Sequence, residues 1–161
     1  MKTNTAGNEP EAHFMKPTLF ERFFNQAFGL FVGLGLAPAD YYLVQVKGRK
    51  SGRIYSTPVY LMELGGKRLL VAPRGYTQWV RNAEAAGEVS LKRGFTTRLF
   101  KLRELRNDEK PEALKAYLDR FKTTVQRYFP VPAGSDSSAF VGLADQYPAF
   151  ELLPSDDKDA G

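Results

Sequence analysis

The fold is decided by the stretch IYSTPVYLMELGGKRLLVA, residues 54–72. Residues 54–64 predict a long strand, because β-branched and aromatic side chains are frequent there. Gly65 and Gly66 follow it, and two adjacent glycines are a strong signal for a two-residue hairpin turn. Residues 68–72 predict a second strand that returns beside the first. The stretch therefore predicts an antiparallel β-hairpin.

The sequence on both sides of this hairpin predicts more strands and several helices. Strands are expected at 42–46, 88–92, 96–105 and 150–153, with a turn at Arg93-Gly94. Helices are expected at 18–36 after Pro17, at 78–86 with Thr77 as its cap, at 111–127 capped by Asn107 or Asp108, and at 139–144. Five or six short antiparallel strands with inserted helices indicate an α+β fold, a small barrel with an N-terminal helix and covering helices. We expect one domain at 17–154, between a disordered tail at 1–16 and an acidic tail at 155–161.

The amino-acid composition excludes several kinds of active site. The chain has no cysteine, and its one histidine, His13, lies in the predicted tail. A folded body without either residue cannot build a Ser-His-Asp triad, a Cys-His pair or a His-ligated metal site, so no metal site is expected. If the protein is an enzyme, a bound cofactor is expected to carry the chemistry.

Positive charge is concentrated in the middle of the chain. The net charge of the whole chain is +5, but residues 41–83 contain eight basic residues and one acid, Glu63, a net of +7. Such a concentration favours an anionic partner, which could be a nucleic acid, a phosphate-bearing cofactor or an acidic lipid. A solvated basic face without a partner is the alternative. Nucleic acid is not expected, because the region lacks the alternation of aromatic and basic residues found in single-strand platforms.

A basic turn lies between two predicted strands. Residues 47–53 read KGRKSGR, with four cations, two glycines and Ser51 in seven positions. A turn of this composition can surround a phosphate or carboxylate with backbone N–H groups and charged side chains. It is not a P-loop, because a strand follows it instead of a helix. Exposed basic hairpin tips are common, so the turn alone leaves both interpretations open.

A second candidate site starts where the strand at 68–72 ends. Residues 73–75 form a Pro-Arg-Gly turn, and a helix begins almost at once. Helix N-termini attract anions through unpaired N–H groups and the helix dipole. Trp79, the only tryptophan, lies in the first turn of this helix. Core packing and lining the slot of a planar ligand are the two roles considered for it.

Together the two segments resemble the deazaflavin-dependent nitroreductase family. The resemblance rests on residues 48–52 (GRKSG) followed by Thr57-Pro58, on residues 72–75, and on residues 79–82 (WVRN), and it covers roughly Leu36 to Leu153. It implies a split β-barrel related to FMN-binding pyridoxamine-phosphate oxidases, and coenzyme F-420, an 8-hydroxy-5-deazaflavin, as the cofactor. Relatives often carry a further arginine where this chain has Tyr55.

The resemblance also implies which residues contact the cofactor. Lys50 and Ser51 would hold its phosphate and acidic tail, with Arg49 and Arg53 beside them. The remaining contacts would come from Thr57 and Pro58 at the ring, from Ala72, Pro73, Arg74 and Gly75 at the phosphate and ribityl part, and from Gln78 and Trp79, which close over the cofactor. Tyr128 is the expected proton donor or a wall of the substrate pocket, and Asn82 is expected to fix the helix in place.

The activity that these observations predict is hydride transfer from a reduced deazaflavin to a small apolar acceptor, such as a quinone, a nitroaromatic or an enone. An FMN-binding oxidoreductase and a non-enzymatic cofactor-binding protein are the alternatives. We expect a cytoplasmic protein, because no signal peptide is visible. The apolar stretch at 27–37 is too short to span a bilayer, which needs about 20 residues; it leaves peripheral membrane contact through the N-terminal helix open.

Overall fold

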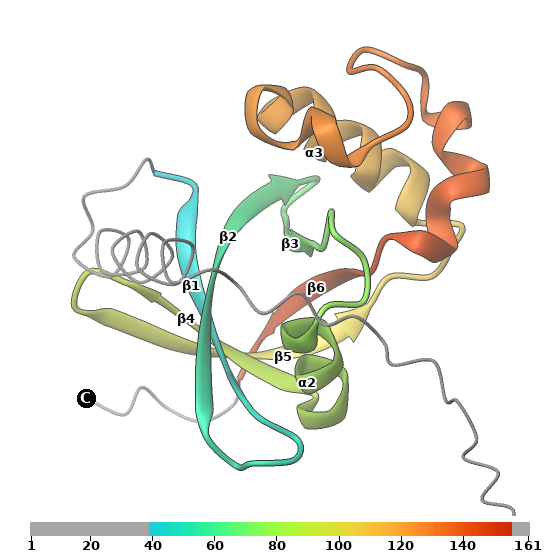
Figure 1. Cartoon of the computed structure of the whole chain (residues 1–161). Helices are drawn as coiled ribbons and strands as arrows, with labels where there is room; N and C mark the ends of the chain where they lie inside the picture. The colour runs from blue at the N-terminus through green and yellow to red at the C-terminus, as the bar shows by residue number, and fades with distance from the viewer. Residues whose placement is uncertain (1–38, 156–161) are drawn as a thin grey trace, which may run out of the picture.

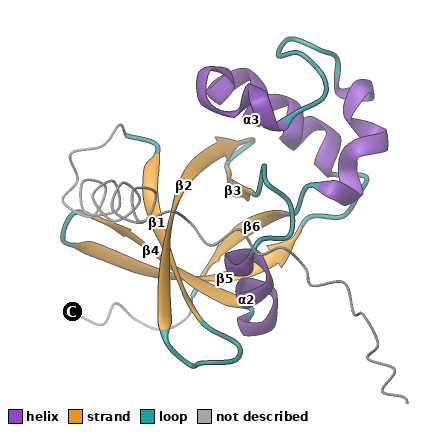
Figure 2. Cartoon of the chain, in the orientation of Figure 1, coloured by secondary structure: helices purple, strands orange, loops and turns teal. Residues whose placement is uncertain are grey.

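The computed structural model describes residues 39–155. Its six strands form a closed antiparallel barrel with helices at its sides (Figures 1 and 2). This confirms the predicted α+β barrel with covering helices and sets the number of strands at six. The expected helix at 18–36, the tail at 1–16 and all but the first residue of the acidic tail lie outside the described residues.

The strands follow the order β1-β2-β3-β6-β5-β4 around the barrel, and β4 pairs with β1 to close it. Their bounds are β1 Tyr41–Lys47, β2 Ile54–Leu64, β3 Lys67–Val71, β4 Glu88–Arg93, β5 Thr96–Glu104 and β6 Ala149–Pro154. The last strand lies between β3 and β5, with Leu70 opposite Phe150 and Leu102 opposite Leu152. A strand from the end of the described chain therefore completes the sheet.

The decisive hairpin forms as the sequence predicts. Gly65 and Gly66 have φ of 57° and 76°, the left-handed values that a two-residue turn needs. Successive residues of β2 point to opposite sides, as in any strand. Val59 and Leu61 pack in the barrel interior, whereas Met62 packs in the outer cluster beneath the helices.

Helix α2, Gln78–Ala86, packs against the barrel interior through Ala83 and Trp79. Gly87 ends it with φ of 71°, as a C-terminal glycine usually does. Thr77 occupies the N-cap position, but its hydroxyl makes no capping hydrogen bond and is buried without a partner among the described residues. The predicted position of this cap is confirmed, and the predicted capping bond is absent.

The other helices cover one outer face of the sheet (Figure 2). They are α3 Lys110–Val125, the 3-10 helix η1 Gln126–Tyr128 and the 3-10 helix η2 Ser137–Gln146. Leu114, Leu118 and Phe140 are fully buried among them.

The prediction of Asn107 or Asp108 as the cap of α3 is wrong, because the N-cap residue is Glu109. Asp108 is instead paired with Arg106 at 3.0 Å. The turn of the second hairpin is Gly94-Phe95, one residue later than predicted.

Candidate functional site

The turn between β1 and β2 is the basic segment singled out in the sequence. It begins after the last pair of the ladder, Lys47 opposite Ile54. The backbone N–H of Gly48 donates to the carbonyl of Arg53 at 2.7 Å, and the N–H of Gly52 donates to the carbonyl of Gly48 at 2.9 Å. The turn is therefore held by its own backbone, which leaves its cationic side chains free to point elsewhere.

Gly48 allows two side chains to approach the backbone of this turn. A Cβ at Gly48 would lie 2.6 Å from Cε2 of the Tyr55 ring and 2.7 Å from Oγ of Ser51. The Ser51 and Tyr55 hydroxyls are themselves hydrogen-bonded at 3.0 Å, and Ser51 Oγ accepts from the N–H of Arg53 at 3.2 Å. A glycine is needed here for its missing side chain, because the two hydroxyl-bearing residues fill that space.

Arg49 connects the basic turn to helix α2. Its guanidinium Nη1 donates to Oδ1 of Asn82 at 2.7 Å and to Oε1 of Gln78 at 3.0 Å. Its backbone N–H donates to the same Asn82 oxygen at 3.2 Å. Asn82 is only 6% exposed, so these bonds fix the distance between turn and helix. The expected role of Asn82 in fixing the helix agrees with these contacts.

The turn, the start of β2 and helix α2 surround a hollow of about 330 Å³. Residues from all three segments line it: Gly48, Arg49, Lys50, Ser51, Tyr55, Ser56, Thr57, Gln78, Trp79 and Asn82. The basic turn and the first part of helix α2 thus meet at one site, whereas the Pro-Arg-Gly turn at 73–75 does not line it. Trp79 packs against the barrel core, with its ring centre 6.2 Å from that of Phe150, and it also lines the hollow. The packing role is confirmed, and contact with a planar ligand stays a prediction.

Within the described part of the chain, Arg49 and Lys50, the two cations that line the hollow, have no carboxylate beside them to compensate their charge. The ion pairs found in residues 39–155 all lie outside the lining of the hollow. The partners of Arg49 are neutral amide oxygens, which orient the guanidinium without cancelling its charge. The hollow is therefore suited to an anionic group with a flat apolar part, the first held by the turn and the second by Trp79.

Six of the twelve predicted cofactor residues line the hollow: Arg49, Lys50, Ser51, Thr57, Gln78 and Trp79. Gly48, Tyr55, Ser56 and Asn82 also line the hollow and are not among the predicted cofactor residues. Two signals could have found some of them. Tyr55 and Thr57 share one face of a strand, and Gln78 and Asn82 are four residues apart on one helix face.

The other six predicted cofactor residues do not line the hollow. Ala72 is buried against Val80 and Phe150, and its N–H donates to the carbonyl of Pro148. Pro58 points to the opposite side of β2 from Thr57, as strand alternation requires. Arg53 and Arg74 are exposed, Pro73 lies in the turn before α2, and Gly75 approaches the carbonyl of Gln146. Contact between these residues and a cofactor stays a prediction.

Tyr128, the predicted proton donor, lies in η1 and packs against the α3 cluster, outside the lining of the hollow. The guanidinium of Arg127 lies 4.8 Å from the centre of the Tyr128 ring. The backbone carbonyl of Tyr128 accepts a hydrogen bond from the Tyr147 hydroxyl at 2.5 Å.

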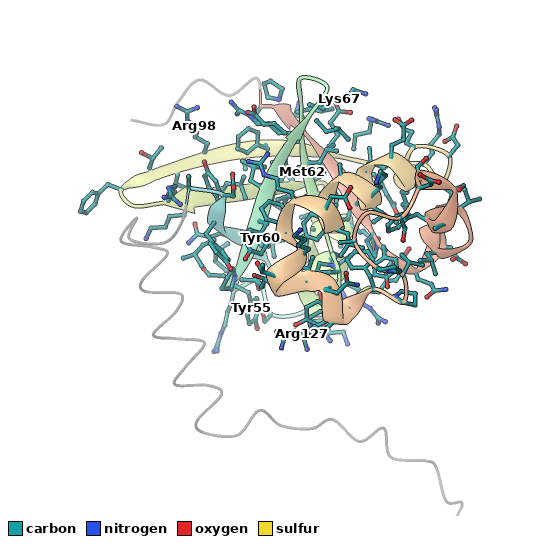
Figure 3. The ribbon with its side chains drawn as sticks, turned by 90° about the horizontal axis from the view of Figure 1, so that it is seen from above. Tyr55, Tyr60, Met62, Lys67, Arg98 and Arg127 are labelled. Carbon is teal, nitrogen blue, oxygen red and sulfur yellow. The ribbon has the colours of Figure 1, made fainter. Side chains whose placement is uncertain are left out.

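Burial raises the pKa of the neighbouring Tyr117, and the nearby hydroxyls of Tyr60, Tyr41 and Tyr128 raise it further. Figure 3 shows Tyr60 on β2 beside α3.

In 39–155 no three histidine, cysteine, aspartate or glutamate side chains gather as metal ligands would. None of the helices in this part of the chain has the length and apolarity that crossing a membrane requires.

Comparison with solved structures shows what the fold resembles. The Agrobacterium tumefaciens protein Atu2129, of unknown function, matches with a TM-score of 0.53 and 18% identity over 85% of this chain, which spans 57% of the length of that protein. A structure described as a domain-swapped dimer matches with a TM-score of 0.50 and 21% identity, over 83% of this chain and 92% of the other. An F420-H2 dependent reductase, FDR-A, has a TM-score of 0.49 and 21% identity, over 71% and 94%. At these identities the likeness concerns the fold.

Comparison with the curated proteins found no match. Residues 20–130, more than half of the chain, match the sequence model of one enzyme family. That stretch contains the basic turn, the Trp79 helix and the hollow between them. This chain belongs to the family of F420H(2)-dependent quinone reductases.

Proposed function

We propose that the hollow between the basic turn and α2 holds the anionic part of coenzyme F-420, and that the protein transfers hydride from the reduced cofactor to a small apolar acceptor. The observation that carries this proposal is the joining of uncompensated cations and a tryptophan in one hollow. The family to which the chain belongs supports the choice of a deazaflavin over FMN.

The basic turn supplies the groups that an acidic cofactor needs. Lys50 contributes an exposed ammonium, and Arg49 contributes a guanidinium held in place by Asn82 and Gln78. Ser51 adds a hydroxyl that lines the hollow. Charge-assisted hydrogen bonds are worth about 1.5–3 kcal/mol each, so two or three of them are enough to anchor a phosphate or glutamyl tail at about micromolar strength.

Trp79 and Tyr55 supply the apolar wall. A planar ring placed against them would lose water from one face and keep the other face open to an acceptor. When bound, a reduced deazaflavin supplies hydride from its C5 atom, so the protein needs no nucleophile of its own. The role left to these residues is to orient the ring so that donor and acceptor atoms come within about 3–3.5 Å.

We propose a quinone as the acceptor, with nitroaromatics and enones as further members of the same class. All three take up hydride and then a proton. Water or the hydroxyl of Tyr128 is proposed to give that proton. Tyr128 is half-buried at the edge of an aromatic cluster that also contains Phe129 and Tyr147, and such surroundings suit an apolar acceptor.

The proposal is tested by titrating the full chain with coenzyme F-420 and following the fluorescence of Trp79, the only tryptophan. The natural protein should show saturable quenching. Lys50→Ala should weaken binding about tenfold, which corresponds to ~1.4 kcal/mol. Steady-state reduction of a quinone by the reduced cofactor should fall in parallel.

Lys122→Ala is the matched control, because it removes the same charge from the exposed face of α3. Its affinity should equal that of the natural protein. Titration with FMN separates the two cofactors, and weaker binding of FMN is expected. Equal affinity of Lys50→Ala and the natural protein for coenzyme F-420 would remove the basic turn from the binding site.

A further inference from the structure

The hairpin between β4 and β5 ends in a fully exposed aromatic side chain. Its turn consists of Gly94 and Phe95, and Gly94 has φ of 59°, as in turns that require glycine at the first of two positions. Phe95 is 102% exposed, the most exposed of the large apolar residues among those described. A tight turn of this kind holds the phenyl ring at the tip, away from the barrel core.

Cations surround this tip on both sides of the hairpin. Lys92, Arg93 and Arg98 lie within three residues of Phe95, and the chain has no acidic residue between Glu88 and Glu104. In the ladder, Leu91 lies opposite Arg98 and Arg93 opposite Thr96, so these side chains share one face. Lys92 lies opposite Thr97 and shares the other face with the partly exposed Leu99.

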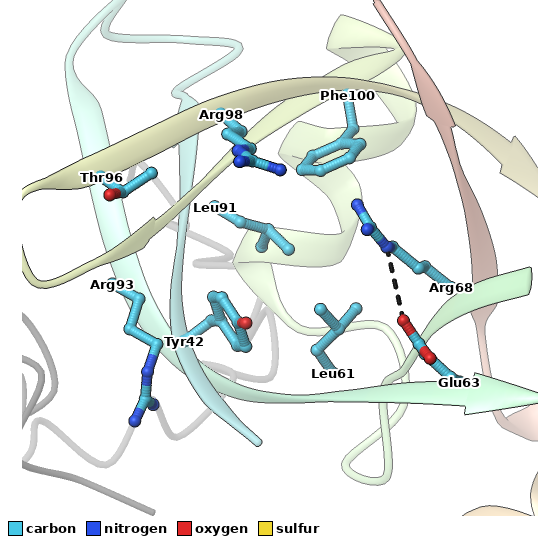
Figure 4. Close-up of a pocket in the computed structure, with 9 residues that line it drawn as sticks. All are labelled: Tyr42, Leu61, Glu63, Arg68, Leu91, Arg93, Thr96, Arg98 and Phe100. Atoms are coloured by element: carbon cyan, nitrogen blue, oxygen red, sulfur yellow. Dashed lines mark ion pairs between the residues drawn. The ribbon is translucent and has the colours of Figure 1, made fainter. Parts of the chain in front are cut away.

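The face with Arg93 and Arg98 borders the open end of the barrel. Figure 4 shows both arginines at the rim of a hollow of about 350 Å³, with Leu91 and Phe100 at its wall. The only carboxylate among the residues that line this hollow, Glu63, pairs with Arg68 at 3.6 Å. Arg98 forms no ion pair with a carboxylate among residues 39–155.

We propose that this tip docks the protein on an anionic membrane surface, with Phe95 inserted between lipid headgroups and Arg98 and Lys92 bound to lipid phosphates. Aromatic rings favour the membrane interface, and each basic residue close to an anionic leaflet adds attraction. A protein partner would need a face of about 800 Å² on each side, whereas the tip offers two apolar side chains on a narrow hairpin. The charge and shape of the tip thus match a lipid surface.

Docking through this tip leaves the cofactor site accessible. In Figure 1 the β4–β5 hairpin projects to one side of the barrel, and the turn between β1 and β2 points in another direction. Membrane docking through this tip requires neither a particular cofactor nor a particular acceptor.

The test is sedimentation of the full chain with vesicles of phosphatidylcholine, with and without phosphatidylglycerol. The natural protein should bind the anionic vesicles and lose that binding as salt is raised. Phe95→Ser should weaken binding about tenfold, ~1.4 kcal/mol, and Arg98→Gln about fivefold, the effect of one cation near the surface. Val141→Ser and Lys122→Gln are matched controls on η2 and α3 and should bind as the natural protein does.

A second measurement reports insertion directly. The chain has no cysteine, so Phe95→Cys carries a single environment-sensitive dye, and Val141→Cys is its control. The emission should shift to the blue on anionic vesicles at position 95 and stay unchanged at 141. The proposal is overturned if Phe95→Ser binds like the natural protein, if neutral and anionic vesicles bind equally, or if the substitutions change self-association in the absence of vesicles instead.

Discussion

Arg49 and Asn82, 33 residues apart in the sequence, are joined by two hydrogen bonds to one oxygen atom. Oδ1 of Asn82 accepts from the backbone N–H and from the guanidinium of Arg49, at 3.2 and 2.7 Å. The asparagine therefore sets the position of the basic turn and the direction of its charged side chain together. Cofactor affinity should depend on this residue, although it is buried and carries no charge.

Asn82→Ala removes the shared acceptor. It should lower the free energy of unfolding by about 1–3 kcal/mol, because the partly buried Arg49 N–H loses its partner. Affinity for coenzyme F-420 should also fall, measured by quenching of Trp79. For the unfolding measurement Gln78→Ala is the control, because it removes one exposed contact to the guanidinium and leaves the backbone bond intact. Its affinity is not used as a control, because Gln78 itself lines the hollow. Equal effects of the two substitutions would contradict the special role of Asn82.

Gly48→Ala should disturb the hollow by displacing side chains. The new Cβ would lie far inside contact distance of the Tyr55 ring and Ser51 Oγ, and the exposed Tyr55 ring is free to swing away. We expect weaker cofactor binding with a loss of stability of about 1 kcal/mol, in the range of mild overpacking. Gly142→Ala in η2 has open space around it and should change neither quantity. Binding as tight as in the natural protein would show that Tyr55 is not needed in its present position.

Glu109 should make the stability of the protein depend on pH in acid. Hydrogen bonds from the Arg103 guanidinium and then from the Arg106 backbone lower the pKa of Glu109 to about 2. Because this folded-state pKa lies below the usual 4.5, the stabilisation is present above pH 4.5 and is lost as the pH falls towards 2. Urea unfolding at about pH 5 and about pH 3 measures it.

Glu109→Gln should flatten that dependence. Glu112→Gln, an exposed position in the same helix, is the control and should keep the slope of the natural protein. If the free energy of unfolding of Glu109→Gln falls between pH 5 and pH 3 as steeply as that of the natural protein, other carboxylates cause the acid sensitivity.

Tyr41 should make the stability depend on pH in alkali. Burial, and then the hydrogen bond with the Tyr60 hydroxyl, raise the pKa of Tyr41 to about 12. Because the folded-state pKa lies above the ordinary 10, the stabilisation is present below pH 10 and is lost as the pH rises to 12. Tyr60→Phe should reduce the loss, because it removes that hydrogen bond. Urea unfolding at about pH 9 and about pH 11 compares the two, with Tyr42→Phe as the control.

Much of the fold could be predicted from the sequence, because its signals are local. The bounds of β2 and α2 are those expected, since glycines mark the end of each element. Caps were harder to predict. Asp108 and Glu109 are both suitable near a helix start, and their roles depend on Arg103 and Arg106, which also bind them.

The site could be predicted in part. The meeting of the basic turn with the Trp79 helix followed from the quoted motifs, but the link through Asn82 requires the packing of α2 on the barrel. The packing of the Ala72 side chain could not be predicted from the sequence. Ala72 lies in a motif of the resembling family, yet the closure of the barrel buries it against Phe150 from a distant strand. The full exposure of Phe95 could not be predicted from the sequence, because the exposure of a side chain depends on which other segments of the fold cover it.

The position of β6 between β3 and β5 has a consequence for how the protein is made. During synthesis on the ribosome, the first five strands leave the exit tunnel while the place between β3 and β5 is still empty. The nascent chain then carries two unpaired strand edges, which are sites of aggregation until residues 149–154 emerge. Shortening the chain before Ala149 should therefore yield insoluble protein even though the basic turn and α2 are complete.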